Sequence, residues 1–395
     1  MDKKVELTRL YLAAVVLLVL MVGFVAGTRS NQLYALVGPV FGVRVETGTL
    51  DDSSLQDAYQ TLKEHYNGDI DDDKLIEGAK HGMIAAVGDP YTVYLDKKEA
   101  DEFNKELTGD IGGGIGAEIG VRNGQPNIIR TLPDNPAEKA GLFAGDVIIG
   151  INDESSDGWD AERAVRAIRG EAGTTVKLTI KRGTETKEFT ITREVINNPS
   201  VSSELRGDVG IVTLSRFDQE TVSLVRKTVN DLKNRGMKKM VLDMRGNGGG
   251  YLDAAPGVAG MWLKDKLVVS VKANKGGEQR LMSEGDVLLN GIKTAVVVNG
   301  GSASATEIVT AALKYHKVTT VVGEKSFGKG TVQELVPLGA GGILKVTIKR
   351  WYVPDGSNVN KKGITPDETV GLTQADLDAG KDPQLEKAIE VVNRP

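Results

Sequence analysis

Cysteine is absent from this chain of 395 residues, and histidine occurs only three times, as His65, His81 and His316. The absence of cysteine excludes disulfide bonds, a cysteine nucleophile and any zinc site built on cysteine ligands. Positive charge is not in excess, because 49 Lys and Arg residues stand against 54 Asp and Glu residues, a net charge of −5. With no basic cluster along the chain, we expect no nucleic-acid partner.

Long apolar runs are equally scarce, and the N-terminus holds the clearest one. Residues 10–28 carry no charge and lie between Arg9 and Arg29. A helix of that length is about 28 Å long, close to one hydrocarbon thickness. Positive residues before the run favour an N-terminus inside and a body outside the membrane. The alternative is a cleaved signal peptide, because residues 25–27 are small enough for a cleavage site. The apolar run is longer than the usual hydrophobic region of a cleaved signal peptide, so we expect an uncleaved signal anchor over residues 1–27.

The remaining chain divides into five segments by pattern. Hydrophobic residues make up 40% and charged residues 26%, which allows two to three folded domains. We expect a tether, an N-terminal helical segment, a small β-rich module, a core of alternating strands and helices, and a C-terminal segment packed on that core. Their respective ranges are 28–48, 49–109, 110–195, 196–353 and 354–395.

Strand–helix alternation in the core predicts an α/β fold with a largely parallel sheet. A helix is expected over residues 220–235, where apolar residues recur at helical spacing. The expected core strands cover residues 209–214, 240–244, 267–271, 294–298, 318–322 and 344–348.

Ser304 is the candidate nucleophile of the core. It stands at the mouth of an expected helix, where free N–H groups could stabilise an oxyanion. Ser304 and Glu307 also form a capping-box pattern, so a purely capping role for this serine stays open. A base is still required, and His316 lies 12 residues along the same helix, roughly 18 Å away. A lysine base therefore remains.

Lys329 is the candidate base, in a glycine-rich loop. Residues 323–329 nearly match a nucleotide-binding P-loop, but Gly330 stands where that motif needs Ser or Thr. Residues 331–338 have a strand pattern, whereas a P-loop needs a helix there. An NTPase is therefore disfavoured, although a solvated loop lysine remains an alternative.

Two glycine-rich turns are further candidates. Residues 246–250 follow an expected strand, but Tyr251 and Pro256 do not fit a dinucleotide-binding loop. Such a turn lets backbone N–H groups approach a ligand closely, although a plain flexible turn is equally compatible. The turn at residues 112–117 is by itself weak evidence for carboxylate capture.

Together, these motifs resemble the carboxyl-terminal processing proteases, also called tail-specific proteases. The resemblance extends from about residue 50 to the end, in the family's order. Ser302 and Thr306 depart slightly from the family pattern, in which Thr and Ser, respectively, are common at these two positions. The matching motifs are residues 82–94, 114–118, 135–142, 242–250 and 302–308, then Lys329, Gln333 and residues 363–367.

The resemblance implies a crotonase- or Clp-protease-like α/β core with an inserted β-rich PDZ domain, besides the N-terminal helices and the transmembrane helix. Ser304 would be the nucleophile, Lys329 the general base and Gln333 its orienting partner. A free lysine has a pKa near about 10.4, so burial must lower it by about two to three units. N–H groups of Ala305 and Gly250, or Gly249 in its place, would hold the oxyanion.

The same resemblance assigns the PDZ domain to substrate tails. The amides near Gly114, Ile115, Gly116 and Ala117 would capture a free C-terminal carboxylate. Arg169 would couple tail binding to the protease. The alternative for Arg169 is a favourable charge at a helix C-terminus.

The expected protein is a membrane-anchored, extracytoplasmic serine endopeptidase, in the periplasm or at the cell surface, that cuts proteins near their C-termini. Its partners would be peptides with free C-termini and the membrane, with homo-oligomers an option. No metal and no cofactor is expected. A catalytically idle PDZ adaptor is the alternative function.

Overall fold

The computed structural model describes most of the chain after residue 52. The predicted tether lies outside the described residues, and so does the predicted anchor apart from five of its residues. No helix within the described ranges is long and apolar enough to cross a membrane. The described residues are 15–16, 18–19, 23, 53–109, 112–122, 124–132, 134–196, 198–273, 276–373, 375–376 and 379–395.

The chain forms two compact units, residues 1–74 and residues 75–395. In the first unit, the described part is mainly helix α3 (Ser53–His65). The Tyr59 hydroxyl donates to Asp72 over 3.0 Å, and the Lys63 ammonium donates to the same carboxylate over 3.2 Å. These bonds join α3 to the first residue of α4 (Asp72–Ala85).

The centre of the second unit is a six-stranded sheet. Its order is β10-β11-β12-β15-β16-β19, and every neighbouring pair is parallel except β10 and β11. The prediction of a largely parallel sheet is therefore confirmed. The strands are β10 (Val201–Arg206), β11 (Val209–Leu214), β12 (Lys239–Asp243), β15 (Lys293–Val298), β16 (Thr319–Gly323) and β19 (Glu368–Thr369).

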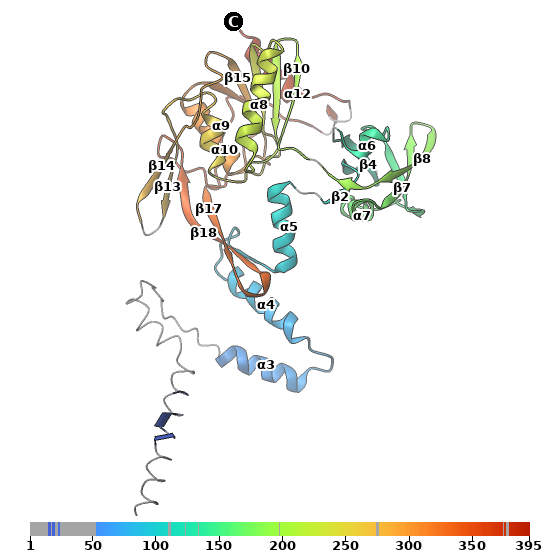
Figure 1. The fold of residues 1–395 in the computed structure, drawn as a ribbon, viewed down its shortest axis with the longest axis vertical. Helices are drawn as coiled ribbons and strands as arrows, with labels where there is room; N and C mark the ends of the chain where they lie inside the picture. Colours follow the sequence, from blue (N-terminus) through green and yellow to red (C-terminus); the bar gives the residue numbers. More distant parts are fainter. Residues whose placement is uncertain are drawn as a thin grey trace, which may run out of the picture. The chain divides into compact units, whose positions relative to one another are not determined.

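Helices cover both faces of this sheet (Figure 1). Alternate strand residues such as Ile211, Val241 and Val297 pack against Leu385 of α12 and its neighbours. The intervening residues pack into a second apolar cluster with three other helices. This two-sided burial explains why the strands are near-continuous apolar runs. The helices are α12 (Pro383–Asn393) on one face, and α8 (Thr221–Asn234), α9 (Ala254–Ala259) and α10 (Ala305–Tyr315) on the other.

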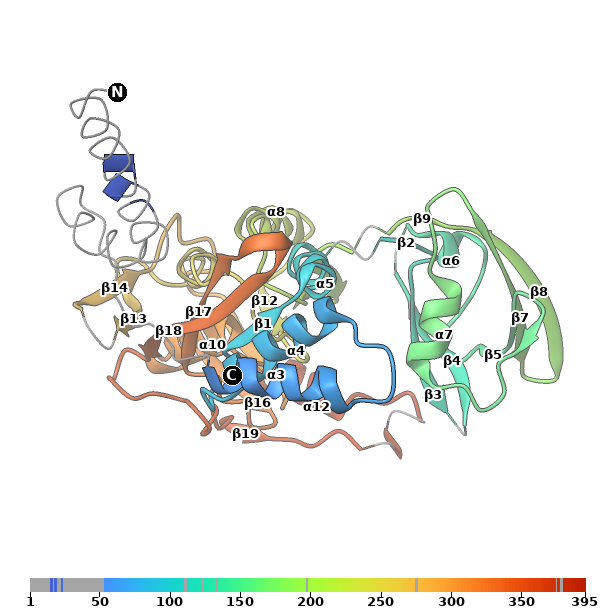
Figure 2. The ribbon, with the colours of Figure 1, turned by 90° about the horizontal axis from the view of Figure 1, so that it is seen from below.

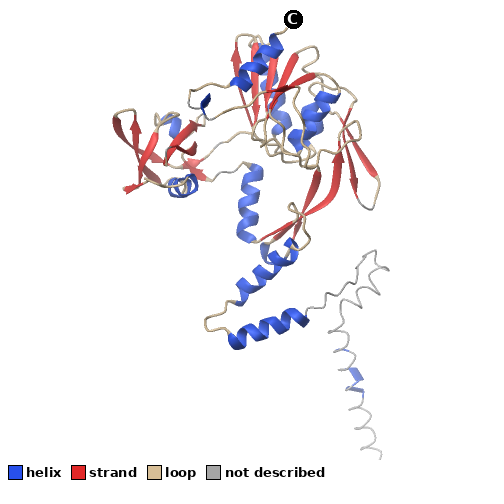
Figure 3. Cartoon of the chain, turned by 180° about the vertical axis from the view of Figure 1, so that it is seen from behind, coloured by secondary structure: helices blue, strands red, loops and turns tan. Residues whose placement is uncertain are grey.

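A second, antiparallel sheet lies beyond α9 and α10, and its core residues Val269 and Trp351 share their apolar cluster. Two runs assigned to the parallel core, 267–271 and 344–348, belong here instead, so that assignment was wrong. Short connections join β13 to β14 and β17 to β18, which permits hairpins but no helical crossover, whereas β13 and β18 pair across a long stretch of sequence. Figure 3 shows the long β17–β18 hairpin from behind. The strands are β1 (Val93–Leu95), β13 (Leu267–Ala273), β14 (Glu278–Met282), β17 (Thr331–Pro337) and β18 (Ile343–Tyr352).

The helical prediction for residues 49–109 missed one strand. Residues 93–95 form β1, which pairs antiparallel with β18 through Val93 and Lys345. Pro90 separates β1 from α4, and α5 (Lys97–Thr108) follows it directly. This pairing joins the chain between α4 and α5 to the sheet whose strand β17 follows the loop of Lys329.

The β-rich module has its own apolar core and contains a six-stranded sheet and the two-stranded sheet β2-β9 (Figure 2). Strands β3 and β4 pair antiparallel as a hairpin, and Asn123 between them lies outside the described residues. Ile128, Leu178 and Ile168 are fully or nearly fully buried within this core. Its elements are β2 (Gly113–Gly114), β3 (Ala117–Arg122), β4 (Gln125–Thr131), α6 (Pro136–Lys139), β5 (Val147–Ile151), β6 (Glu154–Ser155), α7 (Ala161–Ile168), β7 (Thr175–Arg182), β8 (Glu185–Thr192) and β9 (Glu194–Val195).

Candidate active site

One cavity of about 510 Å³ brings the predicted catalytic residues together. Ser304 comes from the start of α10, and Lys329 and Gln333 come from the loop and strand that follow β16. Gly249 and Gly250 reach the same cavity from the turn after β12. Apolar side chains, including Leu252, Ile308, Val332 and Trp351, form much of the remaining wall.

Ser304 has an unusual backbone conformation, with φ 58° and ψ −118°. Residues with a side chain rarely adopt this region, and such strain tends to persist where the surrounding structure enforces it. Ser304 is the N-cap of α10, and it is half-buried and lines the cavity, so a capping position and an accessible nucleophile are compatible in one residue.

Ser302 differs from Ser304 in its surroundings. It is fully buried, and its hydroxyl donates to the carbonyl of Met244 over 2.8 Å. The same oxygen accepts the N–H of Asn299 over 3.0 Å. Both of its hydrogen-bonding roles are thus taken by the backbone, which favours Ser304 as the reactive serine of this segment.

The glycine turn packs directly on the nucleophile segment. A Cβ placed on Gly249 would lie 2.8 Å from Cβ of Ser304 and 3.0 Å from the N atom of Ala305. Gly250 has φ 143°, and a Cβ there would lie 2.0 Å from the carbonyl oxygen of Phe217. Only glycine fits at this approach. Pro256, beyond the turn, does not interrupt the helix α9, because it lies in the first turn of that helix, where proline is tolerated.

The predicted oxyanion donors differ in availability. The N–H of Gly249 donates to the side-chain oxygen of Asn247 over 2.9 Å. Within the described residues, the N–H groups of Gly250 and Ala305 donate to no other group. Of the two alternatives in the turn, Gly250 therefore has the donor that is free to meet an oxyanion, together with Ala305.

Burial lowers the pKa of Lys329 to about 8, and the neighbouring positive charge of Lys345 acts in the same direction. The carboxylates of Glu307 and Asp89 oppose this shift. The Lys329 ammonium also lies 5.4 Å from the ring centroid of Tyr91. A pKa near neutrality is what a lysine needs to act as a base.

Gln333 is held by two threonines. Its side-chain amide donates to Thr331 over 2.8 Å and to Thr347 over 3.1 Å. Its carbonyl oxygen therefore remains as an acceptor. A β-bulge between Val332 and Gln333 re-aims the strand at this point. Among the described residues, no hydrogen bond joins the Lys329 ammonium to Ser304 or Gln333, a looseness common without substrate.

Sequence reasoning missed Thr347 and Lys345 as parts of this site. They lie two residues apart on β18, so both side chains project from the same face of the strand. The polar members of the alternating run at residues 343–349 were the available signal. Their partner could not be inferred, because the run had been assigned to the parallel sheet.

The predicted tail-binding residues line another cavity, of about 290 Å³, in the β-rich module. Gly114, Ile115, Gly116 and Ala117 all border it, and so does Arg169. Within the described residues, the N–H groups of Ile115 and Gly116 donate to no other group. The cavity thus combines two free donors with apolar walls that include Ile168.

Arg169 follows α7 and is exposed. The carbonyls at the end of this helix are met by another residue, Arg193, which the sequence analysis did not identify. Arg193 is buried, and its guanidinium donates to the carbonyl of Ile168 over 2.6 Å and to that of Ala167 over 3.4 Å. The helix-end role considered for Arg169 is therefore largely filled by Arg193.

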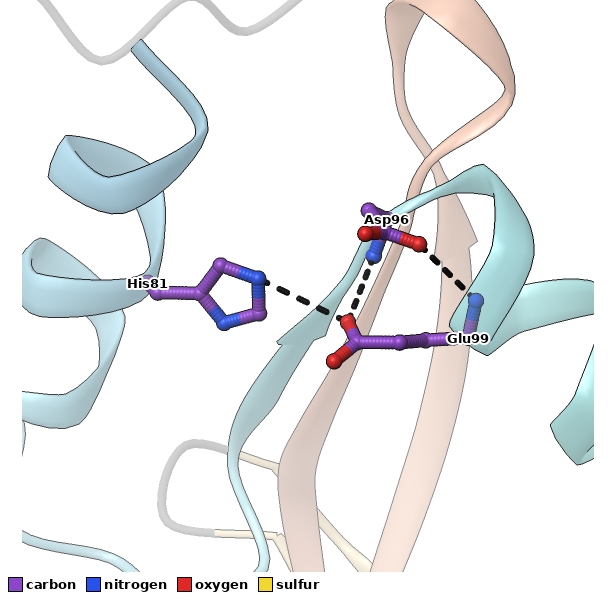
Figure 4. Close-up of side chains that lie close together, drawn as sticks. All are labelled: His81, Asp96 and Glu99. Atoms are coloured by element: carbon purple, nitrogen blue, oxygen red, sulfur yellow. Dashed lines mark hydrogen bonds and ion pairs between the residues drawn. The ribbon is translucent and has the colours of Figure 1, made fainter. Parts of the chain in front are cut away.

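His81, Asp96 and Glu99 form a group whose ligand atoms lie within 4.8 Å of one another (Figure 4). The N–H of Glu99 donates to Asp96 over 2.8 Å, and the N–H of Asp96 donates to Glu99 over 2.9 Å. This reciprocal pair is a cap at the start of α5. His81 of α4 lies 3.5 Å from the Glu99 carboxylate. Helix capping thus explains the two carboxylates without a metal ion.

Profiles of known families match three regions of the chain. The peptidase family S41 profile matches residues 208–370, the PDZ domain profile matches residues 131–182, and the profile of the activating protease CtpB N-terminal domain matches residues 44–99.

Relatives and a solved structure extend these matches. A protein of Staphylococcus haemolyticus described as a CtpA-like serine protease is 38% identical over 320 residues, 80% of this chain and 64% of that protein. A similarly described protein of Staphylococcus aureus is 37% identical over 321 residues, with the same coverage. The chain thus spans just under two thirds of these relatives. A structure described as an S41 protease of Bacteroides fragilis shares the fold, with a TM-score of 0.60 and 17% identity over 78% of this chain and 87% of its own. The chain belongs to peptidase family S41, contains a PDZ domain and is similar to CtpA-like serine proteases.

Proposed function

We propose that this chain is a serine endopeptidase that cleaves protein substrates near their C-termini, with Ser304 as nucleophile and Lys329 as general base. The observation that carries the proposal is the shared cavity of Ser304 and Lys329, in which burial lowers the lysine pKa to about 8. An amine with this pKa is partly neutral at physiological pH and can accept a proton.

The reaction proceeds by acyl transfer. The Ser304 hydroxyl oxygen attacks the scissile carbonyl carbon while the neutral Lys329 amine takes its proton. The C–O bond forms, the carbonyl becomes an oxyanion, and the N–H groups of Gly250 and Ala305 stabilise it. The Lys329 ammonium then protonates the leaving nitrogen, and the C–N bond breaks. Water, deprotonated by Lys329, hydrolyses the resulting ester and regenerates Ser304.

Gln333 orients the base in this scheme. Thr331 and Thr347 hold its amide group, so its carbonyl oxygen can accept a hydrogen bond from the Lys329 amine. A neutral acceptor directs the amine without favouring its protonated form, whereas a carboxylate at this position would raise the lysine pKa.

The PDZ domain is proposed to recognise the substrate tail. The free N–H groups of Ile115 and Gly116, beside Gly114 and Ala117, suit a terminal carboxylate, with the tail adding as a strand. Arg169, exposed at the border of this cavity, is proposed to couple an occupied PDZ domain to the protease.

The finer architecture and the cellular setting are also proposals. The core is proposed to be of the crotonase or Clp-protease type, since its helix-flanked sheet carries the nucleophile at a strand-to-helix turn. The apolar run at residues 10–28 supports a single-pass membrane anchor with an extracytoplasmic body. A homo-oligomer is compatible with this arrangement.

A cleavage assay tests the function against an idle PDZ adaptor. The purified chain should hydrolyse casein without any nucleotide, and Ser304→Ala should abolish hydrolysis. Ser302→Ala is the matched control, two residues away in the same segment, and should keep most activity. Wild-type protein that binds free C-termini but cleaves neither casein nor a tailed peptide would establish the adaptor instead.

A further inference from the structure

Glu307 is a fully buried carboxylate that lies between the nucleophile and the base. Its two oxygens accept four hydrogen bonds. One oxygen accepts the N–H of Ser304 over 2.9 Å and that of Lys329 over 2.8 Å. The other accepts the hydroxyl of Ser326 over 2.6 Å and the N–H of Gly328 over 2.7 Å. All partners are neutral groups, so the anion is stabilised by aimed dipoles.

These bonds reach both ends of the proposed catalytic pair. Glu307 holds the N–H of Ser304, the residue whose backbone occupies a strained conformation. A strained residue needs its surroundings to enforce that shape, and this N–H is one of the points where they do so. An ordinary helix cap would need only the bond from the Ser304 N–H to Glu307.

The remaining three bonds fix the loop that carries the base. Ser326, Gly328 and Lys329 are 19, 21 and 22 residues beyond Glu307, yet all donate to its carboxylate. The carbonyl of Lys329 in turn accepts the indole N–H of Trp351 over 2.9 Å. The Ser326 hydroxyl also accepts the N–H of Ile364 over 2.7 Å.

We infer that Glu307 is the positioning residue of this site, whose carboxylate sets the distance between the Ser304 hydroxyl and the Lys329 amine by bonding both of their backbones. The inference rests on the proposed function, which assigns those two residues their roles. Glu307 itself touches no reacting atom. Misplacement of reacting groups by about 1 Å can reduce a rate by about 100-fold, so a clamp of this kind is decisive for kcat.

The charge of Glu307 supplies a readout that separates positioning from general support of the fold. Its carboxylate raises the pKa of Lys329, against burial and Lys345. The other charged or titratable groups near Lys329 are Lys345 of β18 and Asp89 and Tyr91 of the segment before β1, and Arg216 lines the same cavity. Removal of the Glu307 charge should lower the pKa of Lys329, whereas collapse of the site would expose the lysine and raise it.

The test is Glu307→Gln, which keeps the shape but turns one of the two acceptor oxygens into a donor. We expect kcat for a tailed peptide to fall by about 100-fold with KM changed less than threefold. The midpoint of the residual pH–rate profile should move to lower pH. The rate at which a fluorophosphonate phosphonylates Ser304 should fall in parallel. This reaction needs both Ser304 and Lys329 but does not depend on binding of the peptide substrate. Glu324→Gln is the matched control, an exposed glutamate near the same loop, and should behave as wild type.

Three results for Glu307→Gln would overturn the inference, provided that Ser304→Ala is inactive. These are an unchanged kcat, an effect on KM alone, and a midpoint of the pH–rate profile that stays in place or moves to higher pH. Activity in Ser304→Ala would instead overturn the proposed function, and the inference with it. If Glu307→Gln does not fold, Ser326→Ala decides, because it removes one of the four donors. It should reduce kcat by about fivefold, and an unchanged kcat there would refute the clamp.

Discussion

The cavity of Ser304 and the cavity of Ile115 present similar backbone chemistry in different surroundings. Beside glycine, each has two N–H groups that donate to no other group in the part of the chain that the structure describes, Ala305 and Gly250 in the core and Ile115 and Gly116 in the PDZ domain. In the core, neighbouring polar groups such as Asn247 and Glu307 are buried and fully bonded. In the PDZ domain, the charged residues that line the cavity, Glu118, Arg130 and Arg169, are exposed.

This difference follows from what each cavity would do. Stabilising a transient oxyanion requires donors that are already in place, since reorganisation during the reaction would raise the barrier. Reading a stable carboxylate on a peptide tolerates adjustment, because binding can order the surroundings at a modest cost in affinity. Changes in the core should therefore alter kcat strongly, and changes in the PDZ domain should alter substrate preference mildly.

The largest effects are expected at the catalytic pair. Ser304→Ala and Lys329→Ala should each reduce kcat by about 10³-fold or more, because either change removes the covalent route. Gln333→Ala should cost less, since Gln333 only orients the amine. Peptide hydrolysis followed by mass spectrometry, with circular dichroism to verify folding, measures these losses. An active Ser304→Ala beside a dead Ser302→Ala would show that the wrong serine was chosen.

The pH dependence should follow the proton on Lys329. Because its pKa is lowered to about 8, the amine is protonated below that pH and neutral above it. The value of kcat/KM should therefore rise about tenfold per pH unit below the midpoint and level off above it. Lys345→Met removes a neighbouring positive charge and should shift the midpoint upward. A flat profile from about pH 6 to 9, with chemistry limiting in single turnovers, is incompatible with a lysine base.

The glycine turn allows a test of the core's rigidity. Gly250→Ala would place a Cβ 2.0 Å from the Phe217 carbonyl oxygen, so the turn must move and its N–H with it. Loss of one oxyanion donor typically reduces kcat by about 10²-fold or more. Gly248→Ala is the control, because a Cβ there meets nothing within 4 Å. Equal activity of the two variants would exclude the turn from oxyanion binding.

The sequence predicted the family, the helix-flanked parallel sheet and the pieces of the candidate site, because each depends on local pattern. The short spacings within 302–307 and 329–333 are local, and so is the apolar character of strands buried on both faces. The second sheet was not predicted, since the pairing of β13 and β1 with β18 joins segments far apart in sequence. Arg193 was missed for the same reason, because its partners lie about 25 residues away.

Tail recognition should have a smaller effect than any change in the core. An amidated substrate lacks the carboxylate charge that the N–H groups of Ile115 and Gly116 would meet. A charge-assisted hydrogen bond contributes about tenfold or more, but the amide keeps a carbonyl oxygen as an acceptor, so we expect it to be cleaved about three- to tenfold more slowly than the free acid. Deletion of residues 110–190 should abolish the difference. Equal rates for both peptides with the intact chain would refute tail sensing.

The smallest effect separates two arginines at one end of α7. Arg193 caps the helix and is buried, so Arg193→Ala should reduce the stability of the chain toward urea by about 2 kcal/mol through lost bonds to backbone carbonyls. Arg169 is exposed, so Arg169→Ala should change stability by less than about 0.5 kcal/mol. If Arg169 couples the PDZ domain to the protease, its loss should instead reduce the free-acid to amide rate ratio by about threefold. If Arg169 only interacts with the helix dipole, Arg169→Ala should leave the rate ratio unchanged. An unchanged ratio would therefore exclude Arg169 from the coupling, but it would not contradict tail binding at Ile115 and Gly116.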